Sequence, residues 1–235
     1  MTTTLITGAN KGLGFETARR LVAAGHTVFM GSRDPERGRH AAQELGARAV
    51  VIDVTDDASV AAAAKTVEAG GGLDVLINNA GVEGRGEGNS VIGAADVTGD
   101  MMRELFETNV FGVVRVTHAF LPLLQKSAAP VVVNLSSGLA SLARITEPAT
   151  PSHAYPGVAY PASKTAVNMI TVQYAKAFPG IRINAVEPGY TATDLNGNTG
   201  TQTVEQGAEI IVRMARIGRD GPTGGFFDAT GPVPW

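Results

Sequence analysis

A tyrosine and a lysine stand four residues apart in the stretch GVAYPASKTAV, as Tyr160 and Lys164. Pro161 follows the tyrosine, and proline is tolerated in the first turn of a helix because its missing N–H has no partner there. Residues at i and i+4 lie on the same helix face. The stretch therefore predicts a helix that holds a phenol and an ammonium side by side. They form either an ordinary surface pair or a pair in which the lysine changes the acidity of the phenol.

The composition excludes several classes of function. The net charge of −3 leaves no basic surface for nucleic acid or anionic lipid. The chain has no cysteine, which excludes disulfides, thiolate zinc sites and a cysteine nucleophile, and its four histidines lack the close pairing of a metal site. The opening MTTTLITGAN shows no secretion signal, and no apolar run approaches a membrane span. We expect a soluble cytoplasmic protein that binds neither membrane nor nucleic acid.

Short apolar runs alternate with helical patterns along the chain, which is typical of a parallel sheet covered on both faces. Asp34 and Pro35 are a plausible N-cap and first helical residue. The predicted strands are 4–8, 26–30, 48–53, 73–78, 130–136, 182–188 and 224–227. The predicted helices are 14–24, 34–45, 56–69, 99–126, 159–178 and 203–216. No linker or repeat interrupts them, so residues 1–235 are expected to form one α/β domain of Rossmann type. Its doubly wound parallel sheet would have about seven strands, with helices on both faces.

Two segments do not fit the alternation, 82–98 and 138–158, and both are rich in Gly, Ala and Pro. Each leaves the carboxyl end of a predicted strand, which is where open α/β sheets bind ligands. We therefore expect these segments, together with 190–202, to form the substrate pocket.

The sequence TGANKGLG, residues 7–14, joins the first strand to the first helix. Gly8, Gly12 and Gly14 permit a tight turn and a close approach of the backbone to a pyrophosphate at the helix N-terminus. Their spacing, G-x-x-x-G-x-G, differs from the G-x-G-x-x-G of many dinucleotide folds, so the loop alone is a weak indication. Its position at the first strand–helix turn strengthens the prediction of a dinucleotide site.

The end of the second strand bears on the choice of dinucleotide. An NAD site places a carboxylate there and an NADP site an arginine. Here Ser32 stands at the expected position of the carboxylate, Arg33 follows, and Lys11 of the glycine loop can reach the same region. Asp34 is explained as a helix cap. Either cation alone could be a solvated surface charge, but the pair favours NADPH over NADH.

Four motifs occur in order at the ends of the right elements: TGANKGLG, DVLINNAG (74–81), YPASK and PGYTATD (188–194). With them the chain resembles the short-chain dehydrogenase/reductase family over nearly its full length. The sequences TGANKGLG, PGYTATDL and EQGAE resemble the carbonyl reductase branch most.

The resemblance implies roles for individual residues. Tyr160 would be the general acid of a reduction, Lys164 would lower its pKa and hold the nicotinamide ribose, and Ser137 would bind the carbonyl oxygen. Asn109 would hold a water that links Lys164 to solvent. Asp53 would meet the adenine, Asn78 and Ala80 the adenosine ribose, and the segment 188–193 the nicotinamide. The predicted cofactor contacts, including the cations above, are Gly8, Asn10, Lys11, Gly12, Leu13, Gly14, Ser32, Arg33, Asp53, Val54, Asn78, Asn79, Ala80, Gly81, Tyr160, Lys164, Pro188, Gly189, Thr191 and Thr193.

Elementary electrostatics agrees with the roles of the tyrosine and lysine. A tyrosine with a pKa near 10 is a poor proton shuttle at neutral pH. An ammonium one turn away, with the positive charge of an oxidised nicotinamide, is expected to lower the pKa of Tyr160. Tyr155 lacks such a partner, because Ala159 stands four residues on, and is expected to be a pocket or surface residue.

The serine assignment rests on its motif. Ser136 and Ser137 point to opposite faces of a strand end, and the family's motif uses the second. The step from Ser137 to Tyr160, 160 − 137 = 23 residues, is longer than is usual in the family. Carbonyl reductases carry an insertion here that covers the face used for tetramers. The insertion in this chain is shorter, so a monomer is favoured and a dimer or tetramer stays open.

The predicted function is an NADPH-dependent reductase of a mostly apolar ketone or aldehyde, reversible as an alcohol dehydrogenase. The apolar side chains expected in the pocket are Val82, Leu139, Leu142, Ile145, Tyr155, Val158, Tyr190 and Leu195. Two alternatives remain. One is a non-catalytic NADPH-binding sensor or partner-binding protein on the same fold. The other is an enzyme for alcohol oxidation, epimerisation or dehydration that uses the cofactor transiently.

Overall fold

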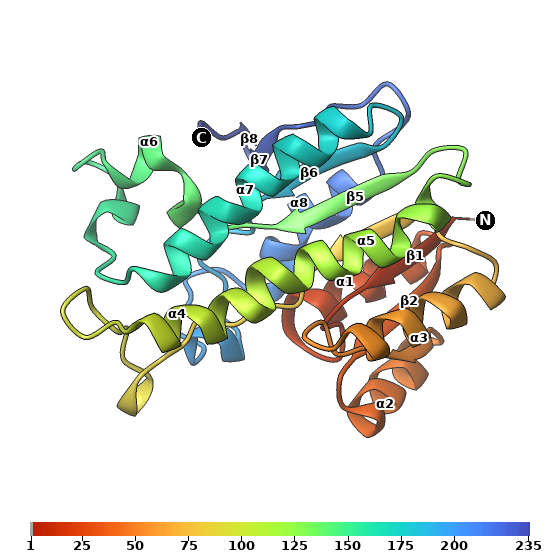
Figure 1. Ribbon diagram of the computed structural model, residues 1–235, viewed down its shortest axis with the longest axis horizontal. Coiled ribbons are helices and arrows are strands. Elements are labelled where there is room, and N and C mark those ends of the chain that lie inside the picture. Colours follow the sequence, from red (N-terminus) through yellow and green to blue (C-terminus); the bar gives the residue numbers. More distant parts are fainter. Residues whose placement is uncertain (1) are drawn as a thin grey trace.

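Eight strands form one sheet in the computed structural model, which describes residues 2–235 (Figure 1). Their order across the sheet is β3-β2-β1-β4-β5-β6-β7-β8, and all neighbours are parallel except β7 and β8. The strands are β1 Thr3–Ile6, β2 Thr27–Ser32, β3 Arg48–Val51, β4 Val75–Asn78, β5 Val131–Leu135, β6 Arg182–Val186, β7 Phe226–Asp228 and β8 Gly231–Pro232. The prediction of a single-domain, doubly wound parallel sheet is confirmed.

The eighth strand is a correction to the expected seven. β8 pairs antiparallel with β7 through Phe227 opposite Pro232. The turn between them closes because Asp228 Oδ1 accepts hydrogen bonds from the backbone N–H groups of Thr230, at 2.8 Å, and Gly231, at 3.1 Å. A two-residue strand leaves too short a pattern in the sequence to be predicted.

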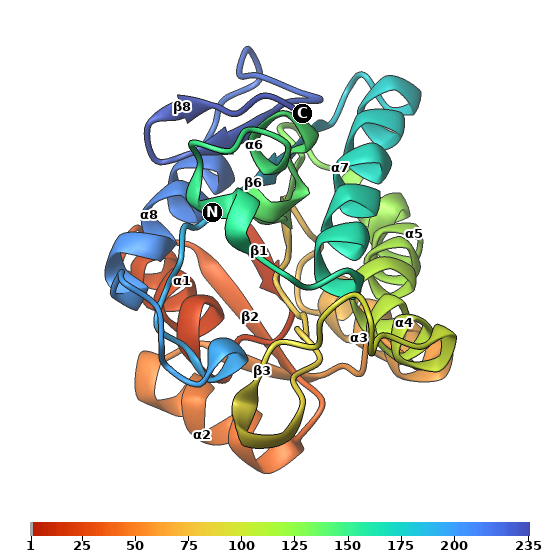
Figure 2. The same ribbon diagram turned by 90° about the vertical axis from the view of Figure 1, so that its left-hand side faces the viewer.

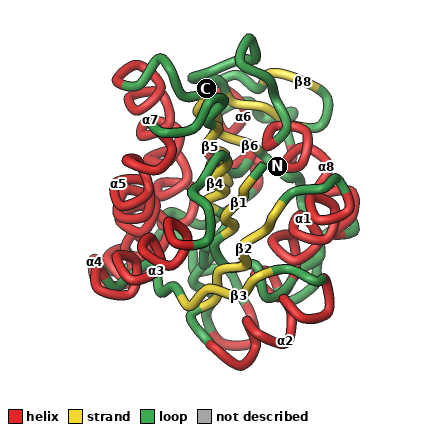
Figure 3. Tube along the Cα trace, turned by 90° about the vertical axis from the view of Figure 1, so that its right-hand side faces the viewer, coloured by secondary structure: helices red, strands yellow, loops and turns green. Residues whose placement is uncertain are grey.

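Helices cover both faces of the sheet. The main ones are α1 Gly12–Ala23, α2 Pro35–Leu45, α3 Asp57–Ala69, α4 Gly99–Phe106, α5 Gly112–Leu124, α6 Leu142–Ile145, α7 Ala159–Ala177 and α8 Val204–Ala215. Figure 3 shows α3, α5 and α7 on one side of the strands and α1 and α8 on the other. Asp34 caps α2 as predicted, since Oδ1 accepts the N–H groups of Glu36 and Arg37 at 3.0 Å.

The strands are apolar throughout because successive side chains enter different layers. Leu5 packs with α3 and α5, whereas its neighbour Ile6 packs with α1 and α8. Val132 and Val133 of β5 divide in the same way. Each residue of a central strand therefore faces a buried layer, which explains the continuous apolar runs in the sequence.

The predicted helix over 99–126 is wrong in its middle. The structure has α4, then a π-helical turn at Glu107–Phe111, then α5. Asn109 lies in this turn, 1% exposed, and its side chain bonds to both backbone groups of Val82: Oδ1 accepts the N–H at 2.9 Å and Nδ2 donates to the carbonyl at 2.8 Å. A π turn re-aims one side chain without ending the helix, and hydrophobic spacing does not reveal it.

A chain of buried polar side chains ties β4 and β5 to the helices of one face. Asn78 Nδ2 donates to Thr117 of α5 at 3.1 Å and to Asn134 Oδ1 at 2.8 Å. Asn134 Nδ2 in turn donates to Thr171 of α7 at 2.9 Å. These bonds fix the angle at which α5 and α7 lie on the sheet, and α7 carries Tyr160 and Lys164.

The loops at the carboxyl ends of the strands gather at one end of the molecule, which faces the viewer in Figure 2. Segments 82–98 and 138–158 are joined there by a bridge between Gly93 and Gly157. Across the described residues, no helix combines the length and the apolar character needed to cross a membrane.

Replacing Asn134 with alanine tests the polar chain. The change removes one buried hydrogen-bond partner from each of Asn78 and Thr171, so the free energy of unfolding should fall by about 2 kcal/mol. Urea denaturation would measure it, with Gln173→Ala, on the exposed face of α7, as the control. A loss of stability no larger than that of the control would contradict the structural importance of this chain.

Candidate active site

A cavity of about 1460 Å³ lies at the carboxyl end of the sheet. Its walls come from the loops after several parallel strands, as the rule for open α/β sheets requires. The predicted site residues that line it are Gly8, Asn10, Lys11, Gly12, Leu13, Gly14, Arg33, Asp53, Val54, Asn79, Ala80, Gly81, Ser137, Tyr160, Lys164, Pro188, Gly189, Thr191 and Thr193. Three predicted residues, Ser32, Asn78 and Asn109, are buried outside its lining.

The glycine loop makes one end of the cavity. Gly8 and Gly12 have positive φ, 63° and 56°, and helix α1 begins at Gly12. A Cβ on Gly14 would lie 2.6 Å from Asn79 Nδ2 and 2.7 Å from the carbonyl of Gly8, so only glycine fits. Lys11, the N-cap residue of α1, makes no side-chain capping bond, so among the described residues the first turn is left uncapped. Its free N–H groups face a cradle whose shape and polarity fit the pyrophosphate of a dinucleotide.

Asn79 shapes this loop from the neighbouring strand. Its Nδ2 donates to the carbonyls of Thr7, at 2.7 Å, and Gly8, at 3.0 Å. The prediction that Asn78 lines the ribose site is wrong, because Asn78 points into the sheet–helix interface and Asn79 takes the cavity side. The two side chains alternate across the strand end, and the motif alone does not show which faces the cavity.

The end of β2 differs from the expectation for Ser32. Ser32 is buried, and its hydroxyl donates to the carbonyl of Asp34 at 2.9 Å, so it shapes the turn instead of facing the cavity. Arg33 lines the cavity and, with Arg115, helps to lower the pKa of Asp53, although the hydrogen bonds from Thr55 have the larger effect.

Lys11 has an acidic partner that the sequence does not reveal. Its Nζ lies 2.6 Å from Asp194 Oδ2, and both side chains are largely exposed. The pairing joins the glycine loop to the loop after β6 and lowers the pKa of Asp194. One of the two predicted cations is therefore neutralised by a carboxylate. Arg33 makes no ion pair with a described residue, although its charge acts on Asp53.

Tyr160 and Lys164 both face the cavity from the first turns of α7. Lys164 Nζ lies 5.7 Å from the centre of the Tyr160 ring and donates to the carbonyl of Leu135 at 2.8 Å. Lys164 is 5% exposed, and burial lowers its pKa to about 8. At pH 7 it is still mostly protonated, so a buried ammonium stands beside the phenol.

The pKa of Tyr160 is raised in the protein on its own, so the predicted direction of its shift is wrong here. Burial is the largest cause, and the carboxylates of Glu83 and Glu187 add to it. Hydrogen bonding from Ser137 and the charge of Arg85 oppose the rise. The phenol is therefore held in its neutral form.

Ser137 and Ser136 face different surroundings, as the strand alternation predicts. Ser137 lines the cavity, and its hydroxyl accepts the N–H of Leu139 at 3.2 Å. Ser136 is buried and donates to Asn168 Oδ1 at 2.6 Å. Ser136 also borders the cavity, but its hydroxyl is taken up by Asn168, so of the two serines Ser137 is the better placed to bind a ligand beside Tyr160.

Asn109 lies behind this wall. Its Nδ2 also donates to Ser163 of α7 at 3.1 Å. A Cβ on Gly81 would lie 3.3 Å from Asn109 Oδ1 and 3.5 Å from Lys164 Nζ, so both polar atoms face the small space that this glycine leaves open. The arrangement suits a water between Asn109 and Lys164.

The substrate end of the cavity is more polar than the sequence predicts. Val82, Leu139, Tyr155, Tyr190 and Leu195 line it, but Leu142, Ile145 and Val158 do not. Among the charged lining residues that were not predicted are Glu83, Arg85 and Glu187.

The buried pair Glu83–Arg85 stands out among these charges. Arg85 Nη2 lies 2.7 Å from Glu83 Oε1, and the Tyr155 hydroxyl donates to the same oxygen at 2.9 Å. Burial and the carboxylate raise the pKa of Tyr155. The sequence contains one signal for this pair, since Glu83 and Arg85 come shortly after the NNAG motif. The contact of Tyr155 with Glu83 appears only in the folded structure.

Residues 2–204 match the model of the short chain dehydrogenase family. The chain belongs to this family. It is 32% identical to (+)-neomenthol dehydrogenase of Capsicum annuum, with 95% of this chain and 94% of that protein covered. Members of the family bind a nicotinamide cofactor, which agrees with the cradle at the glycine loop.

Two solved structures lie close in fold. NADPH-bound carbonyl reductase from chicken fatty liver superposes with a TM-score of 0.86 at 28% identity, covering 100% of this chain and 99% of that one. Salutaridine reductase from Papaver somniferum gives 0.84 at 28% identity, with 97% and 99% covered. The resemblance to the carbonyl reductase branch is confirmed.

The glycine cradle yields a direct prediction. Gly14→Ala puts a methyl group against Asn79 and Gly8, so the dissociation constant for NADPH should rise at least about tenfold. Fluorescence titration with NADPH measures it, and Gly99→Ala, where a Cβ meets nothing within 4 Å, is the control. Equal affinity in the two variants would refute the close fit.

Proposed function

We propose that this chain is an NADPH-dependent reductase of a mostly apolar ketone or aldehyde, able to run in reverse as an alcohol dehydrogenase. The observation that carries the proposal is that Ser137, Tyr160 and Lys164 line the same cavity as the glycine loop. A cofactor cradle and a proton donor thus share one space. The relatives named above are reductases or dehydrogenases, which supports the same class of reaction.

A nicotinamide cofactor would supply the hydride. Backbone groups of Gly8–Gly14 would hold its pyrophosphate, Asp53 and Ala80 its adenosine half, and the segment Pro188–Thr193 its nicotinamide. The Lys164 ammonium has donors left after its bond to Leu135, and these would hold the ribose hydroxyls.

Tyr160 would hand its proton to the carbonyl oxygen of the substrate, and Ser137 would donate a hydrogen bond to the same oxygen. Burial keeps the proton on Tyr160 at neutral pH but makes the phenol a weak acid. The positive charges of Lys164 and of an oxidised nicotinamide would lower its pKa toward the working pH as the reaction proceeds. Asn109 would hold the water through which Lys164 and Tyr160 regain a proton from solvent.

Replacing Tyr160 with phenylalanine tests the acid. The ring is kept and only the proton donor is removed, so kcat should fall at least about a hundredfold while NADPH affinity is unchanged. The assay follows NADPH oxidation over a panel of ketones, quinones and aldehydes. Tyr174→Phe, whose ring stacks on Phe178, is the matched control. Normal turnover by Tyr160→Phe would contradict the proposal that Tyr160 is the acid.

The cofactor preference is tested at Arg33. Its guanidinium lines the cavity and would pair with the 2′-phosphate that distinguishes NADPH from NADH. Arg33→Ala should lower kcat/KM for NADPH about tenfold or more and leave that for NADH unchanged. Arg39→Ala, on the outer face of α2 beside Glu36, serves as control. A parallel loss with both cofactors would contradict the assignment.

A further inference from the structure

Two carboxylates end neighbouring strands at the edge of the cavity. Val186 of β6 is opposite Phe227 of β7, and the next residue on each strand is acidic, Glu187 and Asp228. Their side chains are 18% and 14% exposed. Two negative charges held close together and away from water repel each other. A neighbouring cation is therefore required to stabilise both carboxylates in their charged form.

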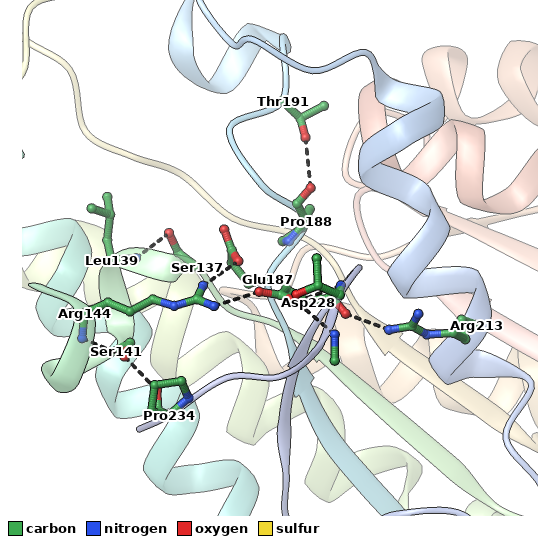
Figure 4. Close-up of polar contacts among 12 residues, drawn as sticks. Ser137, Leu139, Ser141, Arg144, Glu187, Pro188, Thr191, Arg213, Asp228 and Pro234 are labelled. Carbon is green, nitrogen blue, oxygen red and sulfur yellow. Dashed lines mark hydrogen bonds and ion pairs between the residues drawn. The ribbon is translucent and has the colours of Figure 1, made fainter. Parts of the chain in front are cut away.

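Arg144 of α6 supplies the cation. Its Nη1 lies 3.2 Å from Glu187 Oε2 and its Nη2 lies 2.8 Å from Asp228 Oδ2, and Figure 4 shows the guanidinium between the two carboxylates. The arginine side chain is 30% exposed, so water screens these pairs less than ordinary surface pairs. One side chain thus bridges α6 to the ends of β6 and β7.

Glu187 carries this contact on to the turn that bears Ser137. A Cβ on Gly138 would lie 3.0 Å from Glu187 Oε1, so the carboxylate has Arg144 on one oxygen and the Gly138 turn against the other. Gly138 follows Ser137 in the chain. The Ser137 hydroxyl accepts a hydrogen bond from the N–H of Leu139 in the same turn. A displacement of Glu187 would therefore also displace the turn that carries Ser137.

Asp228 is fixed from the other side without help from Arg144. Its Oδ1 holds the β7–β8 turn, and Arg213 of α8 donates to its backbone carbonyl at 2.6 Å. The acidic end of the bridge is thus rigidly anchored in the sheet.

Helix α6 depends on its contacts. It has four residues, too few to be stable alone. Apart from Arg144, the C-terminal tail holds it: Ser141 Oγ donates to the carbonyl of Pro234 at 2.6 Å and the N–H of Ala143 to that of Trp235 at 3.0 Å. Arg144 is the side chain that ties α6 to the cavity side.

We propose that Arg144 is a positioning residue of the active site: through Glu187 and Asp228 it holds α6 and the Ser137–Gly138 turn in the geometry that the reaction needs. The proposal rests on the proposed function, because it gives Arg144 a part in placing Ser137. Arg144 itself does not line the cavity and would not touch the substrate.

Hydrogen exchange on the full chain tests the positioning directly. In Arg144→Met the backbone amides of residues 139–147 should exchange about tenfold faster than in the wild type, because their side-chain link to β6 and β7 is lost and only the contacts with the backbone of the C-terminal tail and of the neighbouring loop remain. Arg144→Lys keeps a cation and should recover most of the protection. Arg103→Met is the control: Arg103 pairs with Asp100 on the exposed surface of α4, away from Glu187 and Asp228, so exchange in 139–147 should stay as in the wild type.

Steady-state kinetics adds a second test. Loss of an ion pair that only stabilised the fold would leave the kcat of the folded enzyme unchanged. On the carbonyl of the panel that the wild type reduces best, Arg144→Met should lower kcat about tenfold and leave KM for NADPH within about twofold, with partial rescue in Arg144→Lys. Unchanged exchange in 139–147, or an equal effect of Arg103→Met, would overturn the proposal. If the wild type reduces no carbonyl at all, the proposed function fails, and the exchange result still decides whether Arg144 holds the turn.

Discussion

The hydrogen bond from the buried Lys164 ammonium to the carbonyl of Leu135, 2.8 Å long, is the contact on which the arrangement of the site depends. An ammonium taken out of water must find acceptors or lose its proton. Leu135 is the last residue of β5, and the chain continues from it into Ser136 and Ser137. One strand end therefore fixes both the lysine and the catalytic serine candidate, and α7 brings the phenol to them.

The charges around the cavity decide which protonation state this arrangement favours. Glu83 and Glu187 stand in its wall, and each raises the pKa of Tyr160, in the same direction as burial. Each carboxylate is in turn held by an arginine, Arg85 or Arg144. The site thus keeps two partly buried ion pairs near the phenol, and the two carboxylates act with burial to hold its proton. That state leaves the proton available but bound tightly, so transfer to a carbonyl oxygen depends on the opposing charge of Lys164 and of the cofactor.

The sequence predicted the elements whose causes are local. Continuous apolar runs predicted the parallel strands, Asp34 and Pro35 predicted the start of α2, and the glycines predicted the turn before α1. It failed where the cause is a distant partner. Arg144 is 43 residues from Glu187 and 84 from Asp228, and Lys11 is 183 from Asp194. Nothing in the neighbourhood of any of these residues indicates its partner.

Register explains the remaining errors. Asn78 and Asn79 are adjacent residues of the same type, and so are Ser136 and Ser137. Which of the two side chains is free to bind a ligand depends on the direction in which each residue points at the strand end. The resemblance to the family's motif indicated the correct serine but not the correct asparagine. The π turn at Asn109 is a similar case: the break in the helix is visible only once Val82 is known to lie against it.

The substrate wall owes its shape to contacts between loops rather than to any one of them. Segment 82–98 is tied to 138–158 by the Gly93–Gly157 bridge and the bond from Tyr155 to Glu83, and to 190–202 by the bond from Asn89 Nδ2 to the carbonyl of Asn196, 3.1 Å long. The C-terminal tail holds the first part of 138–158 through Ser141. Because each loop rests on another, a substitution in one of them alters the pocket formed by all three. For this reason the choice of carbonyl compound is a property of the assembled fold, which no single segment of the sequence reveals.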